Sequence, residues 1–594
     1  MPVVHDPVSV VIADFENGTG DPTFDRALEP TMKLALEGAG FISAYDRSGL
    51  GSRLPDKLDE QAAQQLAVKQ GLGVVLSGSL NRQGSGYGIS VKATQAVTGN
   101  VITTASNRAS SKEQVLGAVT KLAATVRTAL GDDTSGSAQL FAMETLSATS
   151  LEVVHDYAAA MEALSKSRNE DALSAFSKTV ARDPNFGLGY AGMAVASRNL
   201  DKQQDAQKYM QEAVRHLDGM TERERLRIRG LSFKWSGDYQ ACVKEFGDLI
   251  AKYSADAMAR NNLAGCLSIL RELPKAMEEM RQAVKILPKR NLYRENLALY
   301  AAYSTDFETA EREARAIENP GLFGVLPLAF AQVLQGQVPQ ATETYQRLAA
   351  IDDQGASYTA SGLGDLALYE GRFSDAERIL ERGATADMAA QSPDRAAAKF
   401  AALAYARILR GAKGPAIAAA EKALANSQAV KIRFLAARVF VEAGATANAG
   451  TLSAGLGNEL QPEPQAYSLI IDGLTALKNG NPRRAIKDLT EGNALFDTWL
   501  GHFDLGRAYL EAGTFIQADA EFDRCIKRRG EAVSLFLDEE PTFGYFPTAY
   551  YFQGRAREGL NTAGFAESYR TYLTIRGQSK EDALLPEVRR RAGQ

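Results

Sequence analysis

The sequence holds few of the residues from which metal centres, disulfide frameworks and catalytic triads are built. Among 594 residues there are three cysteines and four histidines, and the histidines are scattered without metal-ligand or triad spacing. Cys242, Cys266 and Cys525 lie far apart in apolar helical patterns. This placement favours small buried hydrophobic side chains over a metal set or a disulfide. We therefore predict no catalytic residues, no metal site and no cofactor.

Long apolar runs and an excess of basic residues are also absent. No run of about 18 or more apolar residues occurs, so no transmembrane segment is predicted. The first residues lack the basic and apolar regions of a signal peptide. The 67 basic and 72 acidic residues leave a net charge of −5, which argues against a nucleic-acid partner. Proteins and peptides remain as the expected partners, and the oligomeric state stays open.

The first 132 residues alternate strand and helix patterns, which predicts an α/β or α+β amino-terminal domain. The predicted elements are a strand at 9–15, a helix at 23–40, a strand at 41–45, a helix at 58–71, strands at 73–83, 87–97 and 100–109, and a helix at 111–131. The polar run that follows predicts a linker at 133–149.

From about Ser150 the pattern is helical throughout, and it repeats. Small residues at one position of every second helix are spaced by 34, 36, 34, 34, 31 and 35 residues over their first seven members. The aligned residues are Ala172, Ala206, Cys242, Ala276, Ala310, Ala341, Ala376, Ala416, a weaker match near Ala447, Ala485, Ala518 and Ala566. A period near 34 for paired helices is typical of tetratricopeptide repeats (TPRs). We predict an all-α, right-handed TPR solenoid of eleven or twelve helical pairs at 150–577, with a polar tail at 578–594.

The pair at Trp499–Gly530 illustrates the expected packing. Gly506 on its first helix has almost no side chain, so the second helix can approach closely, and Phe522 fills the space beside the crossing. In such an array each repeat contacts only its neighbours. We therefore expect an extended groove and no deep, dry pocket.

The first domain also resembles a known family. The run ADFENGTGDPTFD (13–25), with a later GLGVVLSGSLNRQ and TGN, is similar to the TolB amino-terminal-type domain. Such domains precede TPR arrays in the extracytoplasmic part of bacterial transmembrane serine/threonine kinases, and similar ones precede repeats in bacterial cyclases and transcription regulators. The matching residues are Ala13, Asp14, Phe15, Asn17, Thr19, Gly20, Asp21, Phe24, Asp25, Gly78, Ser79, Thr98 and Gly99.

The resemblance implies an accessory sensing or docking region of a bacterial signalling protein. In that family a kinase and a membrane helix stand upstream of this region. The implied location is periplasmic or extracytoplasmic if the chain is tethered in that way, and cytoplasmic otherwise.

No kinase motif occurs within the chain itself. GSGYGISV (84–91) is superficially like a phosphate-covering loop, but no VAIK-like lysine, HRD-type loop or DFG follows it. We interpret it as a hairpin turn. Asp14, Glu16, Asp21 and Asp25 lack an accompanying base, so we interpret them as part of a strand-to-helix turn, with Asp21 or Thr23 capping the helix. A ligand or partner contact is the alternative for these carboxylates.

Two sets of residues are candidates for partner binding. First helices of TPRs line the concave face, which predicts that Arg198, Arg227, Lys234 and Asn261 face the groove, with Arg507 and Arg555 at comparable positions farther along. Such a row can hold a peptide carboxylate or an acidic segment, although the run TERERLRIRG (221–230) is also explained by a capping box and solvated helix faces.

The second set lies in an aromatic insertion at 530–552. Phe543, Tyr545 and Phe546 are candidate anchors for a partner. The alternative is that the insertion folds back and covers the apolar end of the array, and we favour it.

The predicted function is a non-catalytic scaffold or sensor region that binds a protein or peptide in the concave groove. The alternatives are an accessory region of a serine/threonine kinase and a structural assembly protein.

Overall fold

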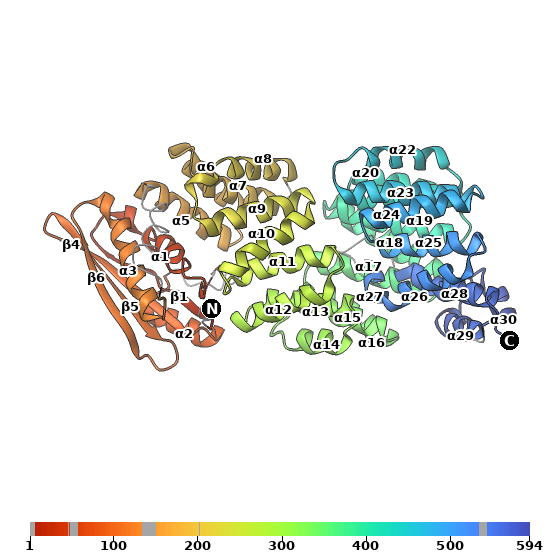
Figure 1. Cartoon of the computed structure of the whole chain (residues 1–594), viewed down its shortest axis with the longest axis horizontal. Helices are drawn as coiled ribbons and strands as arrows, with labels where there is room; N and C mark the ends of the chain where they lie inside the picture. The colour runs from red at the N-terminus through yellow and green to blue at the C-terminus, as the bar shows by residue number, and fades with distance from the viewer. Residues whose placement is uncertain are drawn as a thin grey trace. The chain divides into compact units, whose positions relative to one another are not determined.

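The structure is a computed structural model that describes residues 6–45, 47, 57–133, 150–200, 202–533, 543–562 and 564–593. The chain divides into two compact units. Unit 1 comprises 1–266 and 278–293, and unit 2 comprises 267–277 and 294–594. The first unit therefore combines the amino-terminal sheet with the first helical repeats (Figure 1).

A mixed sheet opens unit 1, and its elements follow the predicted order except for the short strand β2, which was not predicted. Its strands are β1 (Val8–Ile12), β2 (Glu16–Gly18), β3 (Ile42–Ala44), β4 (Val74–Gln83), β5 (Gly86–Gln95) and β6 (Val101–Ala109). The sheet order is β3-β1-β4-β5-β6, with β2 paired to β4. β1 runs parallel to β3 and β4, whereas β4, β5 and β6 form an antiparallel meander.

Three helices and two short 3-10 turns accompany the sheet. They are η1 (Pro22–Phe24), α1 (Leu28–Leu36), α2 (Glu60–Gln70), η4 (Lys112–Gln114) and α3 (Val115–Ala129). Alternate residues of a strand point to opposite faces. Val10 and Leu76 accordingly join the apolar core with α1 and α3, while Val11 and Val75 are buried on the other side. Leu151 and Val154 of the first array helix belong to the same core as α1 and α3.

The remainder of the described chain is a series of paired helices. The pairs are α5 (Leu151–Ser165) with α6 (Asn169–Arg182), α7 (Gly187–Asn199) with α8 (Gln203–Arg215), α9 (Glu222–Ser236) with α10 (Tyr239–Lys252), α11 (Ala257–Ile269) with α12 (Leu273–Ile286), α13 (Asn291–Tyr303) with α14 (Phe307–Arg315), α15 (Leu322–Leu334) with α16 (Val338–Leu348), α17 (Asp353–Tyr369) with α18 (Phe373–Ala389), α19 (Pro393–Leu409) with α20 (Lys413–Asn426), α21 (Val430–Ala443) with α22 (Thr446–Gly457), α23 (Pro462–Lys478) with α24 (Pro482–Leu495), α25 (Trp499–Glu511) with α26 (Phe515–Lys527), and α28 (Phe546–Gly559) with α29 (Phe565–Arg576). Short elements η5 (Leu217–Gly219), α27 (Arg529–Ala532), η6 (Phe543–Tyr545) and α30 (Leu585–Arg591) complete the list.

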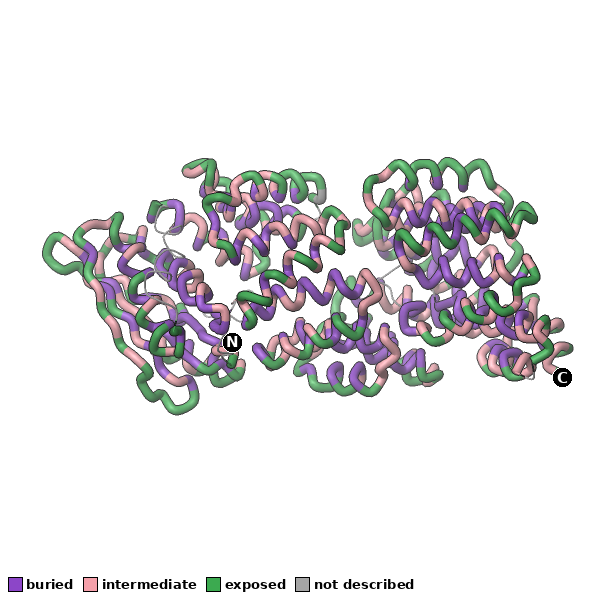
Figure 2. Tube along the Cα trace, in the orientation of Figure 1, coloured by how far each residue is buried: buried purple, intermediate pink, exposed green. Residues whose placement is uncertain are grey.

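These twelve pairs confirm the predicted α-solenoid of TPR type, built from amphipathic helices with buried and exposed sides (Figure 2). The aligned small residues Ala172, Ala206, Ala276, Ala376 and Ala518 are all buried. The match near Ala447 was misplaced by two residues, because Ala449 is the buried residue of α22. The segment predicted as a polar tail carries the helix α30.

A glycine facing a large side chain forms the core of many pairs. A Cβ atom at Gly506 of α25 would lie 2.8 Å from the ring of Phe522 on α26, as expected from the sequence. The same holds at 2.8 Å for Gly230 and the ring of Phe246 in unit 1. Because interiors are close-packed, the glycine is what lets the two helices approach.

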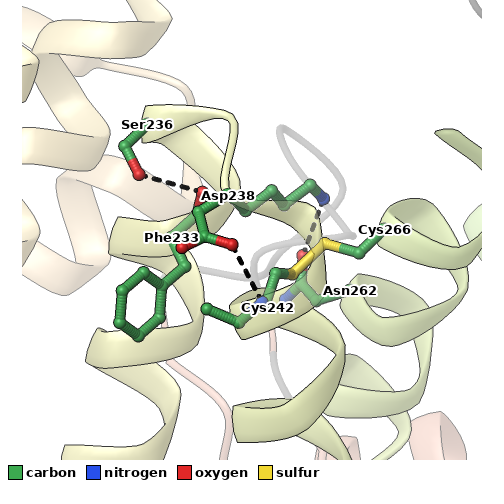
Figure 3. Close-up of a disulfide and its surroundings, with 8 residues drawn as sticks. Phe233, Ser236, Asp238, Cys242, Asn262 and Cys266 are labelled. Carbon is green, nitrogen blue, oxygen red and sulfur yellow. Dashed lines mark hydrogen bonds between the residues drawn. A yellow bond between two sulfur atoms is a disulfide. The ribbon is translucent and has the colours of Figure 1, made fainter. Parts of the chain in front are cut away.

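The expectation that the cysteines form no disulfide was wrong. Cys242 of α10 and Cys266 of α11 are joined by a disulfide, and only Cys525 is a free, buried thiol among the described residues. Figure 3 shows this bond with Asn262 beside it. The sequence pattern misled because both residues occupy buried helix positions, and helical spacing alone does not reveal which positions of neighbouring helices meet.

The expectation that repeats contact only their neighbours was wrong in unit 2. The guanidinium of Arg576 on α29 donates to the carbonyl oxygens of Leu368 and Tyr369 on α17, more than 200 residues earlier in the chain. The hydroxyl of Ser579 likewise donates to the carbonyl of Gly371. The last repeats therefore pack against the middle of the array, and unit 2 is a compact body.

Candidate ligand-binding site

A cavity of about 380 Å³ lies in unit 1 between the sheet domain and the inner helices α5, α7 and α9. Residues of α1 and of the strand ends form one wall, and the first helices of three successive repeats form the other. A volume in this range is typical of small-molecule sites. The expectation that the chain has no deep pocket was therefore wrong, because the sheet domain closes the groove that the repeats alone would leave open.

The cavity combines apolar walls with charged groups. Met161, Leu188, Ile228 and Leu231 supply apolar surface. Several charged side chains of the lining are paired within unit 1. Asp14 accepts from Arg47 at 2.6 Å and from the backbone N–H of Leu58 at 2.7 Å.

Glu162 pairs with Arg26 and, at 2.9 Å, with Lys166. Glu37 pairs with Arg223, and Arg227 pairs with Asp256 at 2.5 Å. The Arg26–Glu162 and Glu37–Arg223 pairs connect the sheet domain to the repeats, because Arg26 and Glu37 belong to the first and their partners belong to the second.

Four buried polar atoms of the lining have no hydrogen-bond partner among the described residues. They are Oε2 of Glu29, Oε2 of Glu37, Oε1 of Glu224 and Nε of Arg227, and of these only Oε2 of Glu37 lies in a carboxylate–arginine ion pair, with Arg223. Buried polar atoms are nearly always paired, so each exception needs an explanation. Their other atoms are held: Glu29 Oε1 accepts from the N–H of Phe15 at 2.6 Å, and Glu224 Oε2 accepts from the N–H of Thr221 at 2.8 Å.

Burial perturbs both carboxylates. Desolvation raises the pKa of Glu29 to about 7, opposed by the backbone hydrogen bond from Phe15. Desolvation also raises the pKa of Glu224, against the hydrogen bonds from Thr221. Removing a carboxylate from water favours its neutral form unless a positive group compensates.

A pair of cations lies one helical turn beyond the cavity on the same helix faces. Val195 of α7 and Leu231 of α9 line the cavity. Arg198 lies three residues after Val195 and Lys234 lies three residues after Leu231, so each cation shares a helix face with the lining residue before it. The guanidinium of Arg198 lies 4.7 Å from the centre of the Trp235 ring. Lys234 Nζ donates to Oδ1 of Asn262 at 3.1 Å.

Neither cation has a carboxylate partner among the described residues. Desolvation, followed by the charge of Arg198, lowers the pKa of Lys234 to about 8. Desolvation also lowers the pKa of Arg198. Two neighbouring, partly desolvated cations with no acid form an arrangement that an anion would stabilise.

The predicted row of Arg198, Arg227, Lys234 and Asn261 is thus partly brought together. The charge of Arg198 acts on Lys234, and Lys234 donates to the neighbouring amide Asn262. Arg227 lies at the cavity and is bound to Asp256. The role of Asn261 on the groove face stays a prediction.

Arg507 and Arg555 have partners within unit 2. Arg507 bonds to Asp504 at 3.0 Å and to Glu442 at 3.2 Å. Arg555 donates to the hydroxyl of Tyr551 at 3.1 Å. Their role as partner contacts stays a prediction.

The aromatic candidates of the insertion are buried. Phe543, Tyr545 and Phe546 are 2%, 9% and 3% exposed. Phe543 stacks on Tyr369 of α17 at 4.5 Å between ring centres, and Tyr545 stacks on Tyr405 of α19 at 3.9 Å. These contacts favour the covering role over the role as partner anchors. Residues 534–542 of the insertion lie outside the described residues.

The acidic run near the first strand is engaged in local contacts. Asp21 caps η1 by accepting from the N–H of Thr23 at 2.9 Å, and it also pairs with Lys112 at 3.0 Å. Asp25 accepts from Asn17 at 2.7 Å. These contacts agree with the interpretation as a turn, while Asp14 also reaches the cavity.

The sequence pointed to neither Glu29 nor Glu224 as a site residue. Glu224 was recognised only as part of the capping box with Thr221, which the structure confirms. Nothing in the sequence marked Glu29 as a site residue, because acidic residues are common in the first turn of a helix. Only the meeting of α1 with α9 across the cavity singles them out.

No cluster of three or more histidine, cysteine or acidic side chains among the described residues is arranged to hold a metal ion. None of the helices described combines the length and the apolar character that a membrane span needs.

No family model and no curated protein matches this sequence. Two solved structures of TPR proteins are similar to it. A MamA double mutant is 20% identical over 26% of this chain and 85% of its own, with a TM-score of 0.22. The complex of Cut9 with Hcn1 from the APC/C is 12% identical over 76% of this chain and 98% of its own, with a TM-score of 0.27. With TM-scores this low, the fold assignment rests on the repeat geometry described above.

Proposed function

We propose that the chain is a non-catalytic binding scaffold that holds a carboxylate of a protein or peptide partner at Arg198, Lys234 and Asn262. The proposal rests on one observation. Arg198 and Lys234 are two cations close enough for their charges to interact, and neither has a carboxylate partner among the described residues. Asn262 holds the Lys234 ammonium in place, and Trp235 supports the Arg198 guanidinium. A carboxylate between them would accept charge-assisted hydrogen bonds from both cations.

The surrounding structure fits such a role. The disulfide joins Cys266 of α11 to α10, and Cys266 lies one turn beyond Asn262 on α11. It therefore restrains the helix that presents the amide. A site whose side chains are held by packing and by neighbouring bonds loses less entropy on binding.

Trp235 provides a direct test, because it is one of only two tryptophans and contacts Arg198. Full-length protein is titrated with hexaglutamate carrying a free carboxyl terminus, and with hexaglutamine amide as the neutral control. Hexaglutamate should change the Trp235 fluorescence in a Trp499→Phe background, and the control should not. Arg198→Ala changes the environment of that reporter, so its affinity is measured by calorimetry. Arg198→Ala and Lys234→Ala should each weaken binding by about tenfold or more.

Lys244→Ala is the matched control, because Lys244 on α10 is exposed and paired with Asp248. It should leave the affinity unchanged. Equal binding of the acidic and neutral peptides, or equal losses in Lys244→Ala and Lys234→Ala, would contradict the proposal.

We further propose that the sheet domain is TolB-like and that the chain serves as the sensing or docking region of a bacterial kinase. The motif at 13–25 supports the first part, and the lack of kinase motifs within the chain agrees with a kinase elsewhere. The disulfide favours the extracytoplasmic location over the cytoplasmic one. Gene sequence upstream of Met1 that encodes a kinase and a membrane helix would support this proposal, and a different upstream domain would refute it.

Purified chain is expected to show no autophosphorylation with Mg-ATP. Thiol labelling of protein taken directly from cells tests the location. Cys242 and Cys266 should be protected until a reductant is added, and free thiols at both positions would argue for the cytoplasm.

A further inference from the structure

The cavity between the sheet domain and α5, α7 and α9 contains two carboxylate oxygens that nothing in the described chain satisfies. Oε1 of Glu224 is the clearer case, since Glu224 is 6% exposed and its other oxygen is occupied by Thr221. Oε2 of Glu29 is the second. A buried carboxylate without a partner is costly. The charges of Arg227 and Arg223 act on Glu224, but neither arginine donates a hydrogen bond to its Oε1. A positively charged donor bound in the cavity would therefore stabilise this arrangement.

The cationic side chains of the lining are mostly engaged already. Arg47 is bound to Asp14, Arg26 to Glu162, and Arg227 to Asp256. Lys166 is bound to Glu162. Lys33 is only partly buried. Most of the positive charge of the lining is thus bound to other carboxylates, while the buried Glu224 and the partly buried Glu29 face the cavity.

An apolar track leads away from Glu224 along its own helix. Ile228 and Leu231 follow Glu224 by four and seven residues, which places all three on one face of α9. Met161 of α5 and Leu188 of α7 line the same cavity. A ligand bound at the carboxylate would therefore lay its remaining atoms against aliphatic side chains.

We propose that this cavity binds a small organic cation, a primary ammonium group carried on an apolar chain or ring. The ammonium bonds to Oε1 of Glu224, and the apolar part lies along Ile228, Leu231 and Met161. Glu29 supplies a second carboxylate, which increases the preference of the cavity for a cationic ligand over a neutral one. This site is separate from the carboxylate site at Arg198 and Lys234, and it stands whether or not that proposal holds.

The pKa shifts of the two carboxylates agree with this assignment. The pKa of Glu224 and that of Glu29 are both raised by desolvation, to about 7 for Glu29. A bound ammonium would lower both values, and binding would release protons near neutral pH. The Nε–H of Arg227 offers one further donor to a polar atom of the ligand.

The test uses three probes of equal shape and different charge with the full chain. Phenylbutylammonium, phenylbutanol and phenylbutyrate are titrated by isothermal calorimetry at pH 7.5. The ammonium compound should bind at least about tenfold more tightly than the alcohol, and the carboxylate should bind most weakly. Titration in buffers of different ionisation enthalpy should show proton release with the ammonium compound.

The decisive variant is Glu224→Gln. Glutamine keeps the acceptor that the capping box with Thr221 requires, so the helix start is preserved while the charge is removed. This variant should weaken phenylbutylammonium binding by about tenfold and leave phenylbutanol binding unchanged. Glu222→Gln is the matched control on the same helix, since Glu222 is exposed and paired with Lys252. It should leave both affinities unchanged.

Three results would overturn the proposal. They are equal affinity for the ammonium and the alcohol, unchanged ammonium affinity in Glu224→Gln, and no binding of the ammonium compound at millimolar concentration. None of these depends on Arg198 or Lys234. A failure here is therefore distinguishable from a failure of the carboxylate site, which hexaglutamate tests.

Discussion

The inner helices of the two units are covered in different ways. In unit 1, α5, α7 and α9 border a cavity of about 380 Å³ and carry polar atoms without partners. In unit 2, the inner helices α17, α19 and α25 are covered by the chain's own segment Phe543–Phe546, which stacks on Tyr369, Tyr405 and neighbouring rings. The repeats are of one kind, so the difference lies in what covers them.

The two units also differ in how their buried charged side chains are paired. In unit 2 the buried Arg438 and Asp504 pair with each other, and Arg438 also lies over the ring of Tyr545. In unit 1 the buried Glu224 keeps an oxygen without a partner among the described residues. The face that the chain fills itself pairs the buried carboxylate of Asp504, although Nε of Arg438 has no hydrogen-bond partner there. The face that keeps a cavity leaves a buried carboxylate oxygen of Glu224 without a partner among the described residues. Four measurements test this contrast.

The largest effect is expected from removing a buried charge in unit 2. Arg438→Ala leaves Asp504, which is 0% exposed, with Arg507 as its remaining cation at 3.0 Å. Breaking a buried pair in this way costs about 3–5 kcal/mol. Denaturant unfolding followed by Trp499 in a Trp235→Phe background measures it.

Lys487→Ala is the control for this loss, because Lys487 is exposed and only 4.0 Å from Glu491. It should change stability by less than about 0.5 kcal/mol. A loss of under about 1 kcal/mol in Arg438→Ala would contradict the claim that unit 2 satisfies its charges by internal pairing.

Reduction of the disulfide should affect unit 1 alone. The bond closes a loop with a sequence separation of 24, for which chain-entropy arguments give a stabilisation of roughly 3 kcal/mol. Unfolding monitored by Trp235 should shift by that amount when a reductant is added, and unfolding monitored by Trp499 should not. The double variant Cys242→Ala/Cys266→Ala should be insensitive to reductant. A Trp235 transition that ignores the reductant would refute the prediction.

The contacts between glycine and phenylalanine inside the helix pairs should contribute similarly to stability in both units. Gly230→Ala and Gly506→Ala each place a Cβ 2.8 Å from a buried phenylalanine ring. Overpacking costs about 1–3 kcal/mol, partly offset by the helix propensity of alanine. We expect a net loss of about 1–2 kcal/mol at each site. Gly450→Ala, with open space around it on α22, should instead gain up to about 1 kcal/mol.

Similar losses of stability at Gly230 and Gly506 would indicate that the repeats are alike and that the units differ only in what covers their inner helices. Losses that differ by more than about 2 kcal/mol would show that the repeats themselves differ.

The smallest effect is the pH dependence of unit 1. The pKa of Glu29 is raised from its ordinary value of 4.5 to about 7, so the folded state holds this proton more tightly than the unfolded state does. Its contribution to stability is present below about pH 4.5 and is lost as the pH rises toward 7. Because Glu29 is partly exposed, we expect a loss on the order of 1 kcal/mol.

Glu29→Gln should remove this slope and be more stable than the parent above pH 7, with the difference vanishing near pH 4. Unfolding monitored by Trp235 at pH 4.5 and pH 7.5 measures it. If the unsubstituted protein gained stability relative to Glu29→Gln between pH 4.5 and pH 7.5, Glu29 would be ionised in the folded state and the prediction would be wrong.

Much of the architecture was predictable from local pattern. The period of Ala172, Ala206 and Ala276 and the pairing of Gly506 with Phe522 are properties of short segments, and each proved to mark a helix pair. Candidate sites were harder. Arg198, Lys234 and Asn261 were predicted because they follow the repeat, and their role in binding stays a prediction, while Asn262, the amide that Lys234 contacts, carried no signal of its own.

Other features depend on contacts between distant segments. Glu224 meets the cavity only because α1 and the sheet close against α9, and Phe543 is buried only because η6 packs against α17. The disulfide belongs to the same group, since Cys242 and Cys266 lie on separate helices. No periodicity in the sequence encodes these encounters.

The sequence by itself determined most elements of this protein: the main strands and helices of the first domain, a series of eleven or twelve helix pairs, and the small residues at most of their crossings. These follow from backbone propensity and from apolar spacing, which act over a few residues. Only the tertiary structure decided which inner faces are filled and which keep a cavity, and hence where charges remain without partners. That outcome depends on the burial of groups far apart in the chain, because a carboxylate becomes costly only once distant segments have removed its water.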